Sequence, residues 1–457
     1  MTRRLLGLFS LLGLLCAFPA AAQQMPAASP APAPQVRSGN NAEFLKATDE
    51  VLAEMSRILG LPVKETLKRS LRSRDEIRAY LIQEMNEDRE PAKRHADDKT
   101  LEAFGLIPRG FPLDSFMLDL LTDQVAGLYD PKAKEFYIAD WIPADEQRTV
   151  MAHELTHALD DQYFHIDSWA KAARPNDDAE LARDAVVEGS AVAAMLDYTL
   201  REQKMSVRDL PDVSALMEGS ALGEMEKDPM MAKAPAFLRD ELVFPYLAGM
   251  SFTQQVLKAN TSWADFRTVF EHPPVSSQQI LHPELYLSGV KPAEVALPDF
   301  AGIVPGEWKN LEENHLGEFG LGEVLKQFLG KERTGKSAAA WAGDRYAVFE
   351  NEKTKQTLLV YRLRLDNAAD AKTFFGVYSE ALETKYRLHE GLAKRPGFLQ
   401  LETTEGVVSL RCVGADCLSV EGGGREVFEK IAKAIGWPPE PAASEAQRPT
   451  AGDAVHD

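Results

Sequence analysis

The chain has 457 residues, of which 45% are hydrophobic and 26% are charged, and its formal net charge is −19. This composition is typical of a globular protein, and the length is sufficient for two or three domains. The excess of acidic residues argues against nucleic acid as a partner, because phosphates are repelled by a field of their own sign.

The first residues have the pattern of an export signal. A basic pair, Arg3 and Arg4, precedes an apolar run at 5–18 and small alanines at 20–22. The alternative is a membrane anchor, but this run is shorter than the roughly 20 residues that cross a bilayer. We therefore expect a signal peptide at 1–22 and an exported protein, periplasmic or secreted, without stable membrane insertion. Loss of the two arginines changes the net charge from −19 to −21.

A leader and a group of helices are predicted next. Residues 23–40 are rich in Ala, Pro and Gln, which predicts a disordered leader. From Ala42 to about residue 121, apolar residues recur at spacings of three and four, which predicts helices. Ser73 and Glu76 have the pattern of a capping box that opens one of them. We interpret this region as the N-terminal part of a domain that spans residues 41–300.

The pattern then changes to short strands followed by long helices. Residues 125–129 and 135–139 flank an Asp-Pro-Lys-Ala-Lys turn, which predicts a β-hairpin. Helical spacing continues the domain beyond the hairpin. The predicted helices cover residues 145–162, 177–200 and 244–259, and a short helix interrupted by Pro283 covers 276–287.

A loop rich in proline between Val290 and Gly306 predicts a domain boundary. The following region, 306–437, mixes strand and helix periods and predicts a smaller α+β domain, with a disordered tail at 438–457. The chain as a whole is therefore expected to be α+β, with a mainly helical first domain. The predicted elements are strands at 346–350 and 356–365, a helix at 368–383, and a hairpin of strands at 407–412 and 417–420.

Two cysteines remain after removal of the signal peptide. Cys412 and Cys417 have four residues between them in the predicted hairpin, in a compartment that permits disulfides. We expect them to be bonded. The alternative is a metal site, which would need two further soft ligands, and His389 is the one candidate close in sequence.

The helix at 145–162 contains the string His153-Glu154-Leu155-Thr156-His157. Residues four apart share one face of a helix, so His153 and His157 can bind the same ion. A catalytic zinc needs three protein ligands and an open position for water, and Glu154 can accept the proton of that water. The alternative is a pair of histidines satisfied by local hydrogen bonds.

The third ligand is inferred from the cost of burial. Glu188 falls within the apolar stripe of the helix at 177–200, where a lone carboxylate is costly unless it is paired or binds a metal. The alternative partner is a buried Arg or Lys. Gly189 weakens a helix interior by about 1 kcal/mol, which is explained if two helix backbones approach closely there.

Two other acids are weighed beside Glu188. Asp184 lies one turn earlier and is predicted to accept a hydrogen bond from the second ring nitrogen of one histidine. Glu218 lies in a second Glu-Gly-Ser-Ala string, but that segment is interrupted by glycine and proline and is farther from His157. We therefore prefer Glu188 as the ligand.

The order of His153, His157 and Glu188 resembles the gluzincins of the zincin clan of metallopeptidases. The strings HELTHALDDQ and VVEGSA are similar to those of poorly characterised secreted bacterial proteins of the zincin type. The resemblance covers about residues 115–290, and it implies a zincin-like domain with Zn²⁺ on these three residues and Glu154 as the general base. Tyr163 stands six positions after His157, so the metzincin pattern is absent.

Peptide hydrolysis also needs a donor for the developing oxyanion. Zincins often use His or Tyr from the far side of the cleft, and His282 and Tyr246 are the candidates here. A surface or packing role is the alternative for His282. The strand at 136–139 is a candidate edge for pairing with an extended backbone, which favours a polypeptide substrate.

Two functions are consistent with this sequence. The first is a zinc-dependent peptidase in which Glu154 activates water. The second is an inactive envelope binding or assembly protein in which zinc is a structural staple and the C-terminal domain docks a partner. The fourth coordination position separates them: a fourth protein ligand, for instance Asp160 or His165, favours the staple, and a bound water favours catalysis.

Overall fold

The structure is a computed structural model that describes residues 40–88, 90–211, 228–260, 262–387 and 393–439. The expected signal peptide, the leader up to residue 39 and the tail from residue 440 lie outside these ranges, as do Glu218 and His389. Among the helices within them, none combines the length and hydrophobicity that a bilayer crossing requires.

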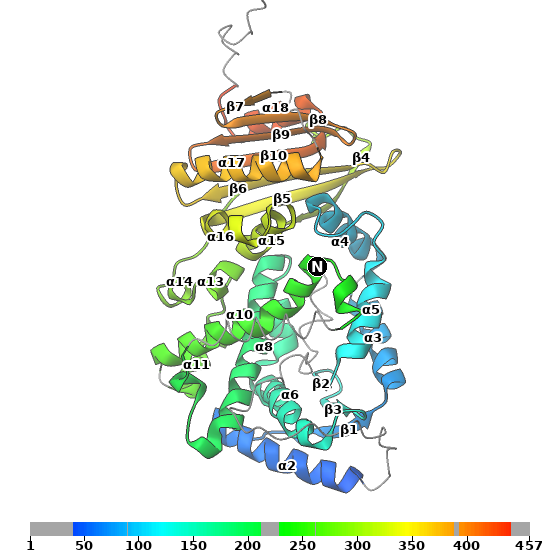
Figure 1. Ribbon diagram of the computed structural model, residues 1–457, viewed down its shortest axis with the longest axis vertical. Coiled ribbons are helices and arrows are strands. Elements are labelled where there is room, and N and C mark those ends of the chain that lie inside the picture. Colours follow the sequence, from blue (N-terminus) through cyan, green and yellow to red (C-terminus); the bar gives the residue numbers. More distant parts are fainter. Residues whose placement is uncertain (1–39, 89, 212–227, 261, 388–392, 440–457) are drawn as a thin grey trace, which may run out of the picture.

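The chain has the α+β architecture that the sequence predicts, with a helical part that carries a small sheet and a C-terminal part built on a larger sheet (Figure 1). The helical part contains α2 (Asn40–Leu59), β1 (Lys68–Arg72), α3 (Arg74–Asp88), α4 (Pro91–Phe104), α5 (Leu113–Gln124), β2 (Gly127–Asp130), β3 (Glu135–Ala139), α6 (Ala144–Phe164), α7 (Ile166–Lys171), α8 (Asp177–Leu200), η1 (Arg201–Gln203), η2 (Val207–Asp209), η3 (Met231–Lys233), α10 (Ala236–Asn260), α11 (Trp263–Phe266), α12 (Thr268–Glu271), α13 (Ser277–Leu281) and α14 (Pro283–Leu287). The C-terminal part contains β4 (Trp308–Asn314), α15 (Gly317–Leu329), η4 (Lys331–Arg333), α16 (Gly335–Ala339), β5 (Trp341–Asn351), β6 (Thr357–Leu365), α17 (Ala368–Lys385), β7 (Ala393–Arg395), β8 (Phe398–Thr403), β9 (Gly406–Val413), β10 (Asp416–Gly423) and α18 (Arg425–Ala434).

The predicted hairpin is confirmed as β2 and β3, and a third strand joins it. β1 pairs in parallel with β3, so the strand order is β1-β3-β2 and β3 is central. The prediction that residues 136–139 form a free edge is therefore wrong, because both sides of β3 are already hydrogen-bonded to neighbouring strands. The short strand β2 is one of the two edges, and all four of its residues are buried.

Helices α8 and α10 touch through their backbones. A Cβ atom added to Gly189 would lie 2.0 Å from the carbonyl carbon of Gly249, and one added to Gly249 would lie 2.0 Å from the carbonyl oxygen of Ala185. This contact confirms the close approach inferred from Gly189. α10 begins at Ala236, earlier than predicted, and it accommodates Pro245 in its interior.

The larger sheet has seven antiparallel strands in the order β4-β5-β6-β10-β9-β8-β7. Its side chains alternate between two faces, as a period of two requires. On β6, Leu359 and Tyr361 face the main core, whereas Leu358 and Val360 belong to a second cluster that includes residues of α18. Cys412 and Cys417 face each other across β9 and β10 and are bonded, so the predicted disulfide is confirmed and the metal alternative there is excluded.

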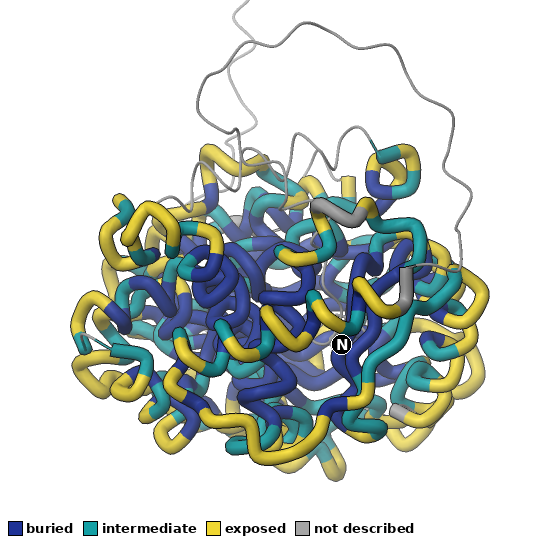
Figure 2. Tube along the Cα trace, turned by 90° about the horizontal axis from the view of Figure 1, so that it is seen from below, coloured by how far each residue is buried: buried dark blue, intermediate teal, exposed yellow. Residues whose placement is uncertain are grey.

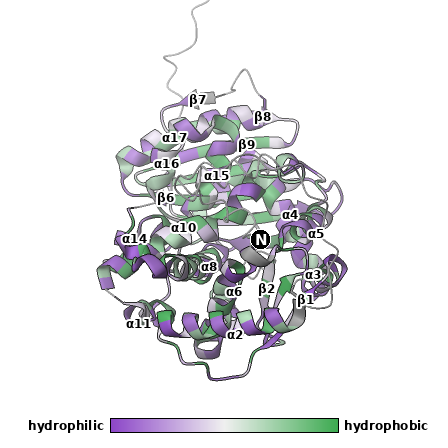
Figure 3. Ribbon diagram, turned by 60° about the horizontal axis from the view of Figure 1, so that its bottom comes forward, coloured by the Kyte–Doolittle hydropathy of each residue, from purple (hydrophilic) through white to green (hydrophobic). Residues whose placement is uncertain are grey.

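The two parts share one hydrophobic core across the predicted boundary loop. Phe104 of α4 makes edge contacts with Tyr346 and Tyr361, at centroid distances of 5.2 and 5.5 Å. Figure 2 shows the buried trace gathered at the centre of the molecule, and Figure 3 shows hydrophilic residues on peripheral helices such as α3 and α14. The boundary near residues 290–306 therefore separates two chain segments, but their apolar interiors are continuous.

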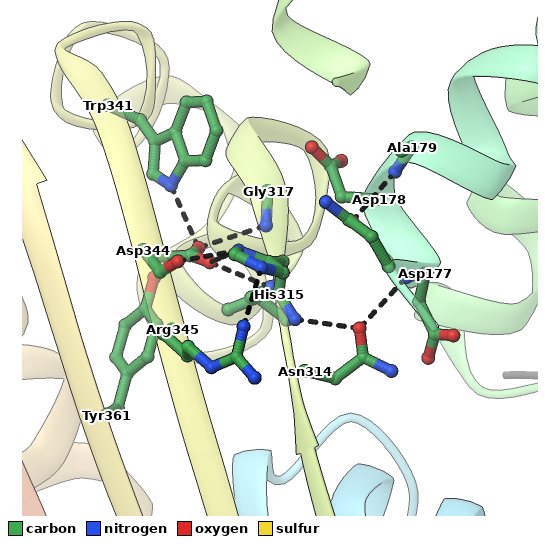
Figure 4. Close-up of polar contacts among 12 residues, drawn as sticks. Asp177, Asp178, Ala179, Asn314, His315, Gly317, Trp341, Asp344, Arg345 and Tyr361 are labelled. Atoms are coloured by element: carbon green, nitrogen blue, oxygen red, sulfur yellow. Dashed lines mark hydrogen bonds and ion pairs between the residues drawn. The ribbon is translucent and has the colours of Figure 1, made fainter. Parts of the chain in front are cut away.

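The first turn of α8 is fixed by the C-terminal part (Figure 4). The side-chain oxygen of Asn314 accepts hydrogen bonds from the backbone N–H groups of Asp177 and His315, at 2.9 and 2.8 Å. Asp344 of β5 accepts from the N–H of Gly317 at 3.0 Å, and Gly317 packs so closely on Asp178 that an added Cβ would overlap its carboxylate. The helix that carries Glu188 therefore starts from a point anchored to the larger sheet.

The contact between α8 and α10 predicts a large effect of one methyl group. Gly249→Ala should lower the free energy of unfolding by about 1–3 kcal/mol or more, because the new Cβ overlaps backbone atoms that cannot rotate away. Gly376→Ala is the matched control, since a Cβ there meets no atom within 4 Å. Urea unfolding of both variants checks the prediction, and equal stabilities would contradict the tight contact.

Candidate metal centre

The structure brings the three predicted ligands together. His153 and His157 lie one turn apart on α6, and their Nε2 atoms are 3.0 Å apart. The Oε2 atom of Glu188, on α8, lies 3.1 Å from His153 Nε2 and 3.4 Å from His157 Nε2. Ligand atoms around a tetrahedral zinc at about 2.0–2.1 Å are themselves about 3.3 Å apart. The spacing of this triad therefore fits a single zinc ion.

The triad lies in the interior, because the middle of α6, from Val150 to Asp161, is buried. Met151, Leu155 and Leu159 are fully buried around the motif, and they hold the helix within the core. His153 and Glu188 are 0% exposed and His157 is 2% exposed. Two imidazoles and a carboxylate can stay in such a buried environment only if their polarity is compensated.

Burial sets the charge states of these groups. It lowers the pKa of His153 to about 4 and that of His157 to about 3, so both imidazoles are neutral at pH 7. Burial also raises the pKa of Glu188 to about 7, against the lowering effect of hydrogen bonds from His153 and Tyr246. Neutral imidazoles are the form that binds metal, and a divalent cation would stabilise the ionised carboxylate.

The second nitrogens of the rings are not held by Asp184, so that prediction is wrong. Within the described ranges, the buried Nδ1 atoms of His153 and His157 have no hydrogen-bond partner, and neither does Oε1 of Glu188. Asp184 is only half-buried on α8.

Glu154 lies beside the triad but is not one of the three clustered ligands. Its side chain is fully buried, and its Cγ lies 3.2 Å from the position that a Cβ on Gly127 would occupy. The Glu154 side chain therefore packs against the edge strand β2, where the absence of a side chain on Gly127 makes room for it. Sequence reasoning did not single out Gly127, although a glycine inside a predicted strand often marks such a close approach.

The hairpin is tied to α6 one turn beyond His157. The hydroxyl of Tyr129 donates to Asp161 Oδ2 at 2.8 Å, and Lys134 forms an ion pair with the same carboxylate. These contacts fix β2 and β3 against the helix that carries the motif. The position of Gly127 relative to Glu154 is therefore determined by several bonds and not by one contact.

Of the two oxyanion candidates, the structure places Tyr246 at the triad and His282 elsewhere. Tyr246 is buried on α10, its ring stacks over that of His153 at 6.1 Å and 22°, and it hydrogen-bonds to Glu188. His282, at the break between α13 and α14, lies 2.9 Å from Glu318 of α15. The predicted role of His282 is therefore wrong, because its ring is turned toward the C-terminal part.

The described residues contain no fourth ligand of the His, Cys, Asp or Glu type in this cluster. His165 is exposed, in a left-handed conformation at the end of α6. Asp160 is buried next to Arg267, and burial raises the pKa of its carboxyl group to about 8. Neither of the residues that would have closed the site therefore joins the triad.

The contacts of Tyr246 predict that its hydroxyl supports metal binding. Tyr246→Phe should weaken zinc binding by about tenfold, because it removes the group that orients Glu188 and leaves the ring in place. Tyr286→Phe is the control, since that hydroxyl donates to the carbonyl of His272. Competition with a chelator measures both affinities. An unchanged affinity in Tyr246→Phe would show that Glu188 does not depend on this bond.

Comparison with known proteins identifies only the C-terminal part. The profile of a family described as Domain of unknown function (DUF8575) matches residues 307–432, which run from just before β4 into α18. The match does not include α6, α8 or α10. No curated protein and no solved structure matches the chain.

Proposed function

We propose that the protein is an exported zinc-dependent peptidase. The observation that carries this proposal is the convergence of His153, His157 and Glu188 to within 3.0–3.4 Å, with no fourth protein ligand of the same kind among the described residues. Three protein ligands and an open position are typical of catalytic zinc, whereas structural zinc has four. The signal-like pattern at residues 1–22 supports export, to the periplasm or the exterior.

Different residues of the chain have different roles in the proposed reaction. His153, His157 and Glu188 would hold the ion, which when bound supplies a Lewis acid and a water that ionises near neutral pH. Glu154, next to His153 in the motif, takes the proton from the attacking water and returns it to the departing amine. Tyr246 keeps Glu188 oriented and is the one remaining candidate to stabilise the oxyanion of a polypeptide substrate.

One observation favours the second function. His153, Glu154, His157 and Glu188 are all between 0 and 2% exposed, so a polypeptide cannot reach them in the arrangement described. A peptidase must therefore open before substrate enters. A zinc that only staples α6 to α8 in an envelope binding or assembly protein needs no such opening, and the C-terminal part would then dock the partner.

The general base separates the two functions. Glu154→Gln should abolish hydrolysis of an unstructured protein such as casein while zinc remains near one per chain, because the variant keeps the ligands and loses the proton acceptor. Glu284→Gln, at an exposed position of α14, is the matched control. Peptide release and metal content are measured on the same samples. Activity in Glu154→Gln equal to that of the wild type would refute the peptidase mechanism.

The metal itself is tested by its effect on stability. Zinc at one hundred times its Kd should stabilise the apo protein by about 2.7 kcal/mol, because it binds the folded chain preferentially. His157→Ala should lose this stabilisation, whereas His165→Ala should keep it, since His165 is exposed outside the triad. Thermal unfolding with and without zinc measures the difference. An equal response of both variants would indicate that the histidines are structural and satisfied without metal.

A further inference from the structure

His282 forms a bond that the proposed reaction does not use. Its Nε2 atom lies 2.9 Å from Oε1 of Glu318, and the Glu318 side chain is only 6% exposed. His282 is the one residue between α13 and α14, and Figure 1 shows these two short helices at the edge of the molecule. The bond therefore joins the α13–α14 junction of the helical part to α15 of the C-terminal part.

Helix α13 is firmly held in place. The N–H of Ser277 donates to the carboxylate of Asp178, at 3.1 and 3.2 Å, and the Ser277 hydroxyl accepts from the N–H of Phe319 at 3.1 Å. The amide of Gln278 donates to the carbonyl oxygen of Trp341. Every residue of α13 except the last is buried. We therefore treat α13 as part of the fixed frame of the molecule.

Helix α14 is held more weakly. None of its five residues is buried, and Leu287 and the following Val290 are exposed. The hydroxyl of Tyr286 donates to the carbonyl oxygen of His272 at 2.8 Å, and its ring packs edge-on against Phe252 of α10 at 5.1 Å between centroids. A segment with few buried apolar contacts opens locally at a low cost in free energy. The bond of His282 to Glu318 is therefore a substantial part of what keeps α14 docked.

Three carboxylates act on the ring of His282. The hydrogen bond with Glu318 raises the pKa of His282 above its usual value of 6.5. Glu284 of α14, at 3.8 Å from Nδ1, and Asp366, which follows β6, raise this pKa further, whereas partial burial opposes the shift. The folded chain therefore favours the imidazolium over a wider range of pH than the unfolded chain does.

The other elements packed against α13 and α14 bring little further charge to this ring. Asp178 of α8 accepts from Ser277, and Lys326 of α15 pairs with Asp240 of α10. The part of α10 that surrounds Phe252, residues 248–257, contains no charged residue. At the end of α12, Glu271 and His272 are both exposed to solvent.

We propose that α14 is a pH-sensitive flap, fastened to α15 by the protonated ring of His282. Loss of the ring proton leaves the buried carboxylate of Glu318 beside a neutral imidazole, so the bond loses its ionic character. Helix α14 then detaches more often and uncovers the ring of Phe252 on α10. This inference does not depend on zinc or on catalysis.

The direction of the pH effect follows from the difference between folded and unfolded chains. Because folding raises the pKa of His282, its stabilisation of the docked flap is fully present below pH 6.5 and is lost as the pH rises through the raised value. Burial also raises the pKa of Glu318, so ionisation of this carboxyl group acts in the same direction. The flap is therefore docked in acidic medium and released in alkaline medium.

Hydrogen–deuterium exchange of the α14 amides tests the flap. The N–H groups of Leu285, Ser288 and Val290 are hydrogen-bonded within this segment and therefore report its opening. Rates are corrected for the intrinsic effect of pH with an unstructured peptide of the same sequence. We expect protection in the wild type to fall about tenfold between about pH 6 and about pH 9, because a hydrogen bond to a charged group is replaced by one to a neutral group. Constant protection over this range would overturn the proposal.

Two variants assign the effect to the ionic bond. His282→Gln keeps a side chain that can donate but cannot titrate, so its protection should be low throughout and vary with pH by less than about twofold. Glu318→Gln should behave in the same way, because the acceptor has lost its charge. His272→Gln is the matched control: it removes a neighbouring exposed histidine and keeps the carbonyl that accepts from Tyr286. A tenfold fall that persists in His282→Gln would refute the role of this ring.

Two further measurements on the wild type separate local release from unfolding. Protection of α17 in the same samples should stay constant, and a parallel fall in α17 would show that the whole chain opens instead of the flap. Titration of the His282 ring by nuclear magnetic resonance should give a midpoint above 6.5, and a lower midpoint would contradict the fastened state. Zinc-free protein should give the same exchange profile, so a failure of the peptidase proposal is distinguishable from a failure here.

Discussion

A carboxylate enclosed with two neutral imidazoles is the interaction on which the rest of the structure depends. None of these three groups tolerates the interior alone, because each loses its hydration and gains little from apolar neighbours. Their approach to 3.0–3.4 Å takes place where α6 is buried, from Val150 to Asp161, and where it packs against the largely buried α8. Burial in the apolar core therefore makes the ionised carboxylate unfavourable, and a bound cation would stabilise it.

Three glycines make the space that this group of side chains needs. Gly189 and Gly249 let α8 and α10 meet at their backbones, which brings Tyr246 over His153 and within reach of Glu188. Gly127 makes the corresponding room for Glu154 on the opposite side, beside the hairpin. The functional groups come from three helices, but glycine determines how near those helices and the hairpin approach one another.

Local patterns predicted the elements that carry strong periodicity, and long-range contacts decided the rest. The helix around His153, the helix around Glu188 and the disulfide hairpin were all predictable, because spacing or covalent chemistry specifies them. β1 was missed since its sequence, Lys-Arg-Ser-Leu-Arg, has little of the apolar alternation of a strand. The roles given to Asp184 and His282 were wrong because a helix register fixes direction only roughly, and the partner of His282 lies 36 residues away on α15.

The anchoring of α8 at Asp177 and Asp178 has a mechanical consequence. Eleven residues, or about three turns and 16 Å of rigid helix, separate Asp177 from Glu188. Any tilt of β4 and β5 relative to the helical part would therefore tilt α8 and move the carboxylate of Glu188 at the middle of that helix. The family profile covers Asn314, Gly317 and Asp344, which anchor this helix, but it does not cover the helix itself. The part of the chain that the profile matches thus helps to position the His153, His157 and Glu188 side chains, and exchanging it for another domain would change the spacing of this triad.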